Sequence, residues 1–380
     1  MRGCAALFML ACMNKNQGTM DMQVQRRRVL LCALAAGLSC TAEPALAASE
    51  PLVVAPTPRK TATKPEKSRL VLAINNRSAL YYLPLTVAEQ LGYFADEGLE
   101  VEVQDLGSTA RVLQALAGGS ADVVSGWLDN TLTQQGKGNM LQAFVLQSRA
   151  PQIALGLSPR IPLEPQSLVV LRGRRVGIVA PGTPSHTVAY AALARAGLRR
   201  DEMGFVSVGT SASAMAALRA GQIDALCYSD PVMTLLEQRG ELRIVADTRS
   251  LQGCAQVFGG DMPATALSAA QEFVQKHPHT VQALTDAMVR ALKWLHMAGM
   301  SDLLRTVPES YFADDRALYL AAYMRMRDTV SSDGLISAEG MQNLQSALFA
   351  ADPLLRNFRF DLQRSYSNSF ALKAKQRFKV

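Results

Sequence analysis

The chain has 380 residues, of which 49% are hydrophobic and 19% are charged, and its formal net charge is +7. The basic excess lies before residue 48 and after residue 355, whereas the body between these segments carries slightly more acidic than basic residues. Because nucleic-acid binding needs clustered lysine and arginine on the folded body, this distribution excludes nucleic acid as an expected partner.

The first 47 residues predict a leader that ends in a secretory signal peptide. Arginines at 26–28 precede an apolar run at 29–39 that is too short to span a bilayer, and residues 45–47 form an A-x-A cleavage site. The paired arginines leave the twin-arginine export route open beside the general one. Residues 48–69 are rich in Pro, Thr and Lys and predict a disordered linker. Since no later segment is long and apolar enough to cross a membrane, we expect a soluble, periplasmic mature protein.

From residue 70 onward, strand patterns and helix patterns alternate, and they do so twice in the same order. The first unit is expected as strand 70–74, helix 83–91, strand 100–104, a helix that opens at 107–108, and strand 121–124. The second unit is expected as strand 176–179, a helix up to 196, strand 205–208, a helix that opens at 209–210, and strand 223–227.

The two units also share their internal spacing. Gly107 and Asp122 are 15 residues apart in the first unit, and Gly209 and Asp224 are 15 residues apart in the second. Both aspartates are expected to serve turn geometry. Strand–helix alternation produces parallel strands through right-handed crossovers, so the duplication predicts two α/β lobes with a ligand cleft between them.

The turn at 180–184 is the most informative segment of the second unit. Its Pro and Gly residues separate a buried strand from a helix, so the first backbone N–H groups of that helix are expected to point outward unpaired. With the helix dipole they would receive a negative or strongly polar ligand, and the hydroxyls of Thr183 and Ser185 would add donors. A plain turn with Ser185 as an ordinary N-cap fits the same residues.

With these elements in place, the chain from about residue 70 to 361 resembles the extracytoplasmic solute-binding proteins of ABC transporters. The most similar group binds aliphatic sulfonates, taurine, nitrate and thiamine-related pyrimidines. The resemblance rests on residues 83–85 (LPL), 92–101 (GYFADEGLEV), 115–123 (ALAGGSADV), 173–177 (GRRVG), 181–183 (PGT) with His186, and 220–225 (AGQIDA).

The resemblance implies a two-lobed type II periplasmic-binding-protein fold whose first lobe is discontinuous. We expect residues 70–172 and 257–361 in the first lobe, residues 173–256 in the second, and a frayed basic tail at 362–380. A strand-like run at 254–258 is expected to return the chain to the first lobe. Ser268 and Gln271 then look like a capping box, followed by a long amphipathic helical segment at 281–295.

The candidate ligand-binding residues lie at strand ends and at the first turns of helices. In the first lobe they are Asn76, Ser78, Tyr81, Tyr82, Ser108, Thr109, Ser125 and Trp127, and in the second lobe they are Thr183, Ser185, His186, Tyr228 and Asp230. Several have a structural alternative: one of Tyr81 and Tyr82 can face the core, and Asp230 before Pro231 can simply cap a helix. Arg77 is the one first-turn residue that could offer a positive charge.

The expected function is capture of a small anionic or polar organic solute by hinge closure, followed by docking on an ABC permease in the inner membrane. We expect a monomer that needs no cofactor. No metal site is expected, because the sequence has no CxxC, HExxH or ligand-spaced set of histidines.

Two alternatives share the fold. One is an enzyme of the lyase or desulfinase kind, which would need a reactive cysteine or a pyridoxal-bearing lysine at the cleft; no cysteine occurs at 75–78 and no histidine lies near Cys227 in sequence. The other is a sensor subunit that presents its ligand to a membrane kinase. After leader removal only Cys227 and Cys254 remain, and they can either pair or stay reduced.

Overall fold

The structure is a computed structural model that describes residues 64–162 and 168–380. The predicted signal peptide and most of the predicted linker lie outside these residues. Within the described ranges, none of the helices combines the length and the apolar character that a membrane span requires.

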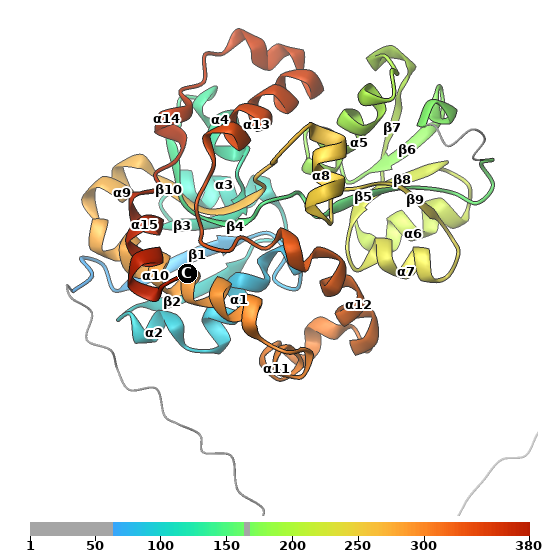
Figure 1. Ribbon diagram of the computed structural model, residues 1–380. Coiled ribbons are helices and arrows are strands. Elements are labelled where there is room, and N and C mark those ends of the chain that lie inside the picture. Colours follow the sequence, from blue (N-terminus) through green and yellow to red (C-terminus); the bar gives the residue numbers. More distant parts are fainter. Residues whose placement is uncertain (1–63, 163–167) are drawn as a thin grey trace, which may run out of the picture. The chain divides into compact units, whose positions relative to one another are not determined.

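Two five-stranded mixed sheets form the framework of the described chain (Figure 1). The first has the order β2-β1-β3-β10-β4 and the second has the order β7-β6-β8-β5-β9. The first contains β1 (Arg69–Ile74), β2 (Glu100–Asp105), β3 (Val123–Trp127), β4 (Leu141–Ser148) and β10 (Thr265–Ala270). The second contains β5 (Ile153–Leu157), β6 (Arg175–Ile178), β7 (Gly204–Ser207), β8 (Ala225–Ser229) and β9 (Arg243–Asp247).

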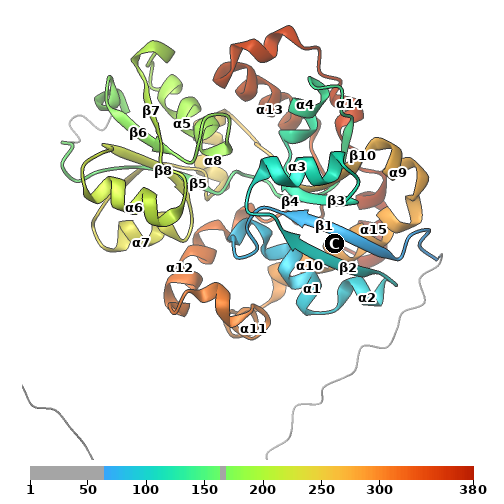
Figure 2. The ribbon, with the colours of Figure 1, turned by 180° about the vertical axis from the view of Figure 1, so that it is seen from behind.

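Helices cover both faces of each sheet (Figure 2). Those around the first sheet are α1 (Leu83–Gln90), α2 (Tyr93–Asp96), α3 (Thr109–Ala117), α4 (Asn130–Gln135), α9 (Gln271–Lys276), α10 (Pro278–Met297), α11 (Met300–Thr306), α12 (Arg316–Met326), α13 (Ala338–Ala351), α14 (Leu362–Ser365) and α15 (Ser369–Phe378). Those around the second sheet are α5 (Pro184–Arg195), α6 (Ser211–Arg219), α7 (Val232–Gln238) and α8 (Leu251–Phe258). The two-lobed α/β fold expected from the duplication is therefore confirmed.

The alternation of side chains along β1 explains how one strand serves two cores. Leu72 and Ile74 face the large cluster formed with α1 and α10, whereas Ala73 faces the smaller cluster under α3. The predicted amphipathic segment forms α10, whose Met288 and Leu292 are fully buried against the sheet. Met288 thus packs in the core of the first lobe, on the apolar face of the predicted amphipathic segment.

The repeated aspartates perform the same task in both lobes. Asp122 Oδ2 accepts a hydrogen bond from the Val71 amide at 3.0 Å, and Asp224 Oδ2 accepts one from the Arg175 amide at 2.9 Å. Each aspartate also donates its own amide to the carbonyl of that same residue, at 2.9 Å and 2.8 Å. Each aspartate thus joins the entry of one strand to the neighbouring strand, a structural role exerted between strands and not within a turn.

The crossing between the lobes occurs earlier than expected, which corrects the boundary placed at Arg172. The strand that follows β4 is β5, and it pairs antiparallel with β8 and β9 in the second sheet. The sequence pattern of residues 153–157 (IALGL) is a short apolar run without alternation, and only pairing between distant strands reveals which sheet it joins.

The return path also differs from the expectation. Residues 254–258 belong to α8, which Ser250 caps by accepting a hydrogen bond from the Gly253 amide at 3.1 Å. The returning strand is β10, so Ser268 lies within a strand and does not open a capping box. Strand β10 pairs with β3 on one side and with β4 on the other, and this pairing outweighs the weak strand preference of its alanines.

The short crossing determines where the strand ends meet. Strand β4 runs parallel to β3, and residues 149–152 lead from its carboxyl end directly into the amino end of β5. Because β5 is antiparallel to β8 and β9, its amino end lies at the carboxyl edge of the second sheet. The carboxyl edges of the two sheets, where open α/β sheets bind ligands, are therefore adjacent.

The C-terminal tail is part of the first lobe, which corrects the expectation of a frayed terminus. Helix α15 packs along α10 and buries Phe370, Ala371 and Ala374. Arg377 forms ion pairs with Glu97 and Asp286. The apolar stripe of α15 was missed in the sequence because basic residues dominate the composition of the tail.

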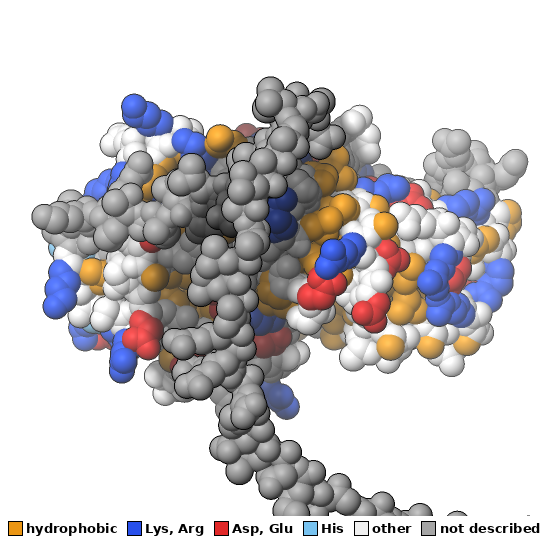
Figure 3. Space-filling view, turned by 90° about the horizontal axis from the view of Figure 1, so that it is seen from below, with side chains coloured by type: hydrophobic (Ala, Val, Ile, Leu, Met, Phe, Trp, Pro, Cys, Tyr) orange, Lys and Arg blue, Asp and Glu red, His pale blue; other side chains and the backbone are white. Residues whose placement is uncertain are grey.

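On the face seen in Figure 3, acidic and basic side chains are interspersed where the described surface is visible. No patch of a single sign is apparent on that part of the surface. The mixture agrees with the near-neutral body of the chain.

Candidate functional site

Tyr81 and Trp127 bring two segments of the first lobe together at its carboxyl edge, with ring centroids 5.1 Å apart. The neighbouring Tyr82 is 1% exposed and donates its hydroxyl to Asn75 Oδ1 at 2.7 Å, so Tyr82 is the core member of the tyrosine pair. Burial raises the pKa of Tyr81, and the nearby phenol of Tyr228 raises this pKa further. Tyr81 and Trp127 thus form an aromatic pair of the first lobe at this edge.

The turn after β1 is tied to the first lobe. Ser78 Oγ donates to Asn76 Oδ1 at 3.1 Å, and both residues are exposed. Arg77 is ion-paired with Glu89 and also donates to the Val103 carbonyl at 3.0 Å. The one positive charge considered for the ligand is therefore engaged within its own lobe.

The hydroxyls at the starts of the neighbouring elements also have partners inside the lobe. Ser108 caps α3, and Thr109 Oγ1 accepts a hydrogen bond from Asn75 Nδ2 at 3.1 Å. Ser125 is fully buried, and its hydroxyl accepts a hydrogen bond from Gln147 Nε2 at 2.8 Å. Ser125 is thereby placed within the sheet's packing and outside the lining of the pocket described below.

The hydroxyls of the 180–184 turn brace the turn itself. Ser185 is 2% exposed, and its Oγ accepts a hydrogen bond from the Val179 amide at 2.9 Å. Thr183 Oγ1 donates to the Ala180 carbonyl at 2.7 Å and lies 3.0 Å from Ser185 Oγ. Helix α5 begins at Pro184, so Ser185 lies within its first turn and Thr183 occupies the N-cap position.

Backbone amides of this turn are used internally as well. The amides of Thr183, His186 and Thr187 donate to carbonyls inside the turn, and the Gly182 amide donates to His186 Nδ1 at 3.3 Å. The expectation of unpaired, outward-pointing amide donors is therefore wrong at these four positions, because acceptors within the turn and the first turn of α5 pair with these amides.

His186 lies on a different face of α5 from the pocket lining. Its ring packs edge-on against Phe205 with centroids 4.7 Å apart, and burial together with Arg200 lowers its pKa. Pro184, Thr187 and Val188 line the pocket instead. Residues three and four positions apart share a helix face, so Pro184, Thr187 and Val188 lie on one face of α5 and His186 lies on another.

The candidate Asp230 belongs to an internal network of charged residues in the second lobe. Asp230 is 7% exposed, accepts a hydrogen bond from the Thr234 amide at 2.8 Å, and is ion-paired at 3.2 Å with Arg249, which is 1% exposed. Although burial opposes it, hydrogen bonding and charge from Asp247 and Asp230 raise the pKa of Arg249. Asp230 thus stabilises the lobe and lies outside the pocket lining, while Tyr228 donates to the Gly209 carbonyl at 2.9 Å.

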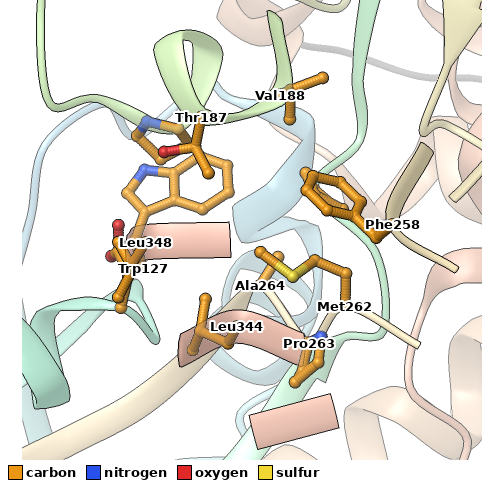
Figure 4. A pocket seen from close by; sticks show the side chains of 12 residues that line it. Trp127, Thr187, Val188, Phe258, Met262, Pro263, Ala264, Leu344 and Leu348 are labelled. Carbon is orange, nitrogen blue, oxygen red and sulfur yellow. The ribbon is translucent and has the colours of Figure 1, made fainter. Parts of the chain in front are cut away.

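A narrow pocket lies where the carboxyl edges meet (Figure 4). The first lobe contributes residues after β3 and from α13, the second contributes the first turns of α5, and the crossing segments complete the wall. Its lining consists of Trp127, Asp129, Pro151, Pro184, Thr187, Val188, Phe258, Met262, Pro263, Ala264, Leu344 and Leu348. In this conformation there is room for water-sized molecules, so an organic solute requires the lobes to separate.

Figure 4 shows how the walls face each other. The indole of Trp127 lies beneath the α5 turn that carries Thr187, and the ring of Phe258 lies across the pocket from it. Leu344 and Pro263 form the side away from α5. Of these lining residues, sequence reasoning had identified Trp127 alone. Leu344 and its neighbour one turn along follow a helical core pattern, and nothing in the sequence places α13 beside α5.

Asp129 is the one acidic residue in this lining. It occupies the N-cap position of α4 without a side-chain capping hydrogen bond, and its Oδ1 is buried without a hydrogen-bond partner. Burial raises the pKa of Asp129 to about 6, against the lowering effect of the Asn130 amide. No sequence signal had distinguished this aspartate from an ordinary residue at a helix start.

The remaining cysteines do not form a disulfide and are buried in separate places. Cys227 lies in β8 and Cys254 in α8, and burial raises the pKa of both thiols, to about 12 for Cys254. Thiols held in this way are poor nucleophiles, which removes the basis for cysteine chemistry at this site. The described residues contain no group of His, Cys, Asp and Glu side chains that could hold a metal ion.

Comparisons with known proteins agree with this architecture. A solved structure of a Bordetella bronchiseptica RB50 protein is 40% identical, covers 84% of this chain and 100% of its own, and superposes with a TM-score of 0.75. The alkanesulfonate-binding protein SsuA from Xanthomonas axonopodis pv. citri, solved bound to MOPS, is 19% identical, covers 81% of this chain and 100% of its own, and has a TM-score of 0.65.

A protein of Bacillus subtilis (strain 168) that bears the name of a binding protein, YtlA, is 20% identical over 276 residues, which are 71% of this chain and 80% of YtlA. Residues 63–304 of the chain match the NMT1-like family. This match spans more than half of the chain. The protein therefore belongs to the NMT1-like family and has the fold of the periplasmic binding proteins.

Proposed function

We propose that this protein is the periplasmic solute-binding component of an ABC importer, acting as a monomer that captures a small polar organic solute between its lobes. The observation that carries the proposal is the pocket lined from both lobes and from the crossing segments. A site built in this way is complete only when the lobes are together, so a solute that touches both walls favours the closed state.

The contacts between the lobes fit a hinge. The chain crosses between the lobes at residues 149–152 and 259–264. Away from these segments, α7 and α12 are joined by the ion pair of Glu237 with Arg325 at 3.0 Å, whose side chains are 28% and 43% exposed. A partly exposed ion pair of this kind contributes little to stability, so separating the lobes there costs little.

The solute class follows from the lining and from the relatives. The lining is mostly apolar, which suits a solute with an organic body, and Trp127 offers an aromatic face. SsuA is an alkanesulfonate-binding protein, so aliphatic sulfonates, taurine among them, are the first solutes to consider. The described lining contains no arginine or lysine, which favours a polar or zwitterionic organic solute over a bare anion.

The test is a thermal-shift and calorimetric screen of the mature protein against sulfonates, taurine, nitrate, pyrimidines and aromatic acids and amines. A ligand at about 100 times its dissociation constant stabilises the folded state by about 2.7 kcal/mol. We expect at least one class to raise Tm, and we expect Trp127→Ala to abolish that rise. The matched control for loss of an indole is Trp294→Ala on α10, because Trp294 packs partly buried against the core of the first lobe and does not line the pocket. A shift that survives in Trp127→Ala would place the site elsewhere.

Delivery to a permease is tested separately from capture. The solute-loaded protein should stimulate ATP hydrolysis by its cognate permease complex in proteoliposomes, and the solute-free protein should not. If a solute binds tightly but no permease responds, the capture step stands and a ligand-presenting sensor role replaces transport.

A further inference from the structure

The pocket holds a charge that its own chain does not neutralise. Ten of the twelve lining residues are apolar, Thr187 adds one hydroxyl, and Asp129 alone is ionisable. Two arginines beside the segments between the lobes have partners elsewhere: Arg249 pairs with Asp230 and Asp247, and Arg149 lies 3.6 Å from Asp261. None of the described lysines or arginines forms an ion pair with Asp129.

The carboxylate is also short of hydrogen bonds. Its Oδ1 is buried and unpartnered, although its position before α4 would allow the side chain to cap the helix. An ionised carboxylate accepts several hydrogen bonds, and leaving it buried without them is expensive. A folded chain tolerates such a group most readily where a ligand supplies the missing partner.

The neighbouring aromatic side chain narrows the chemistry of that partner. Trp127 lies two residues before Asp129 and lines the same pocket, where its ring packs against Tyr81. Indole is the side chain that attracts a cation most strongly through its π face, and a carboxylate attracts the same group. An anion would meet repulsion from Asp129 and find no basic side chain in the lining.

We propose that Asp129 is a specificity-determining residue that accepts hydrogen bonds from a cationic nitrogen of the solute, so that the solute is an organic ammonium or amidinium compound, zwitterions included. This inference rests on the proposed solute-binding function and deepens it. The apolar walls contact the body of the solute, and Asp129 selects its charged end.

The experiment uses matched probes that differ at one group. Calorimetry of the mature protein would compare benzylamine with benzyl alcohol and benzoate, and taurine with 2-hydroxyethanesulfonate. We expect the amine of each set to bind at least about tenfold more tightly than its neutral or hydroxylated partner, the scale of one charge-assisted hydrogen bond. Asp129→Asn should remove that preference while leaving the affinity for the uncharged partner within about twofold.

Controls separate selectivity from folding. Asp201→Asn removes an equal charge from the exposed Asp201–Arg199 pair on the second lobe and should leave the preference intact. Asp129→Glu keeps the charge and should retain part of the preference, and the circular dichroism spectrum of each variant reports whether the fold is kept.

The outcomes are distinguishable. If the wild-type protein binds probes but prefers the anionic or neutral member, or if Asp129→Asn leaves the preference unchanged, Asp129 does not select a cation and is satisfied by water, while solute capture stands. If no probe and no solute of the wider screen binds, both the capture function and this inference are rejected.

Discussion

Asp129 provides a sharp test of the physical argument even before a solute is known. In the solute-free protein the side chain of Asp129 is partly exposed but one of its carboxylate oxygens, Oδ1, is buried beside apolar groups, and its pKa rises from 3.8 to about 6. Replacing it by asparagine removes the charge and nearly preserves the shape. We therefore expect Asp129→Asn to be more stable than the wild-type protein at neutral pH, in exchange for lost solute selectivity.

The magnitude follows from the shift. A difference of about two pKa units corresponds to about 3 kcal/mol at 1.36 kcal/mol per unit, and the cost of desolvating the amide that replaces the carboxylate reduces this gain. About 2 kcal/mol is a reasonable expectation, which raises Tm by several degrees in a chain of this size. The effect requires no change in packing.

The pH dependence has a definite sign. A raised carboxyl pKa means that the folded state holds the proton more tightly than the unfolded state does. The destabilisation is therefore absent below about pH 3.8, grows as pH rises to about 6, and is complete above that. The variant and the wild-type protein should have equal stability near pH 3.5 and diverge by pH 7.

The assay is urea unfolding of both proteins at pH 3.5, 5, 6, 7 and 8, followed by fluorescence and circular dichroism together to detect intermediates between the lobes. Asp201→Asn is the control, because that aspartate is exposed and should produce no comparable divergence. A variant that is less stable than the wild-type protein at pH 8, or a difference that does not change with pH, would refute the reasoning.

Two further predictions concern residues whose hydroxyl or thiol is held inside the second lobe. Ser185→Ala should destabilise the protein by about 1–2 kcal/mol, because the Val179 amide loses its acceptor, yet change solute affinity less than twofold. A tenfold loss of solute affinity in calorimetry would indicate that Ser185 contacts the solute. Titration with a thiol reagent should find two reactive thiols, Cys227 and Cys254, in the unreduced protein after denaturation and almost none before it. Absence of reaction after denaturation would indicate a disulfide.

The duplicated unit could be derived because its signals are local. A strand of branched apolar residues, a Gly- or Pro-containing turn and a helix start each follow from the preferences of a few neighbouring residues. The equal spacing of Asp122 and Asp224 likewise pointed to one shared structural task, and each clamps adjacent strands by the same pair of hydrogen bonds. Elements with weaker local signals, such as β5 and β10, were missed because pairing between distant strands defines them.

The candidate site shows the same division. Position along the chain directed attention to strand ends, and Trp127 lines the pocket, although whether it contacts a solute stays a prediction. It could not show that Ser185 turns its hydroxyl inward to Val179, because the direction of a side chain at a helix start depends on the closed turn around it. Predictions for Asn76, Ser78, Tyr81 and Tyr228 as ligand contacts stay predictions for the binding experiments.

The sequence alone predicted two α/β lobes with a ligand cleft between them. Local residue preferences and one order of elements that occurs twice were enough for this prediction. Tertiary structure decided which face of α5 meets the first lobe, where the chain crosses, and which acid is left without a partner. The physical reason is that a charged side chain stays unpaired only when none of the helices and strands packed around it supplies a partner. Such a deficit at Asp129 becomes visible only after helices far apart in sequence have packed around it.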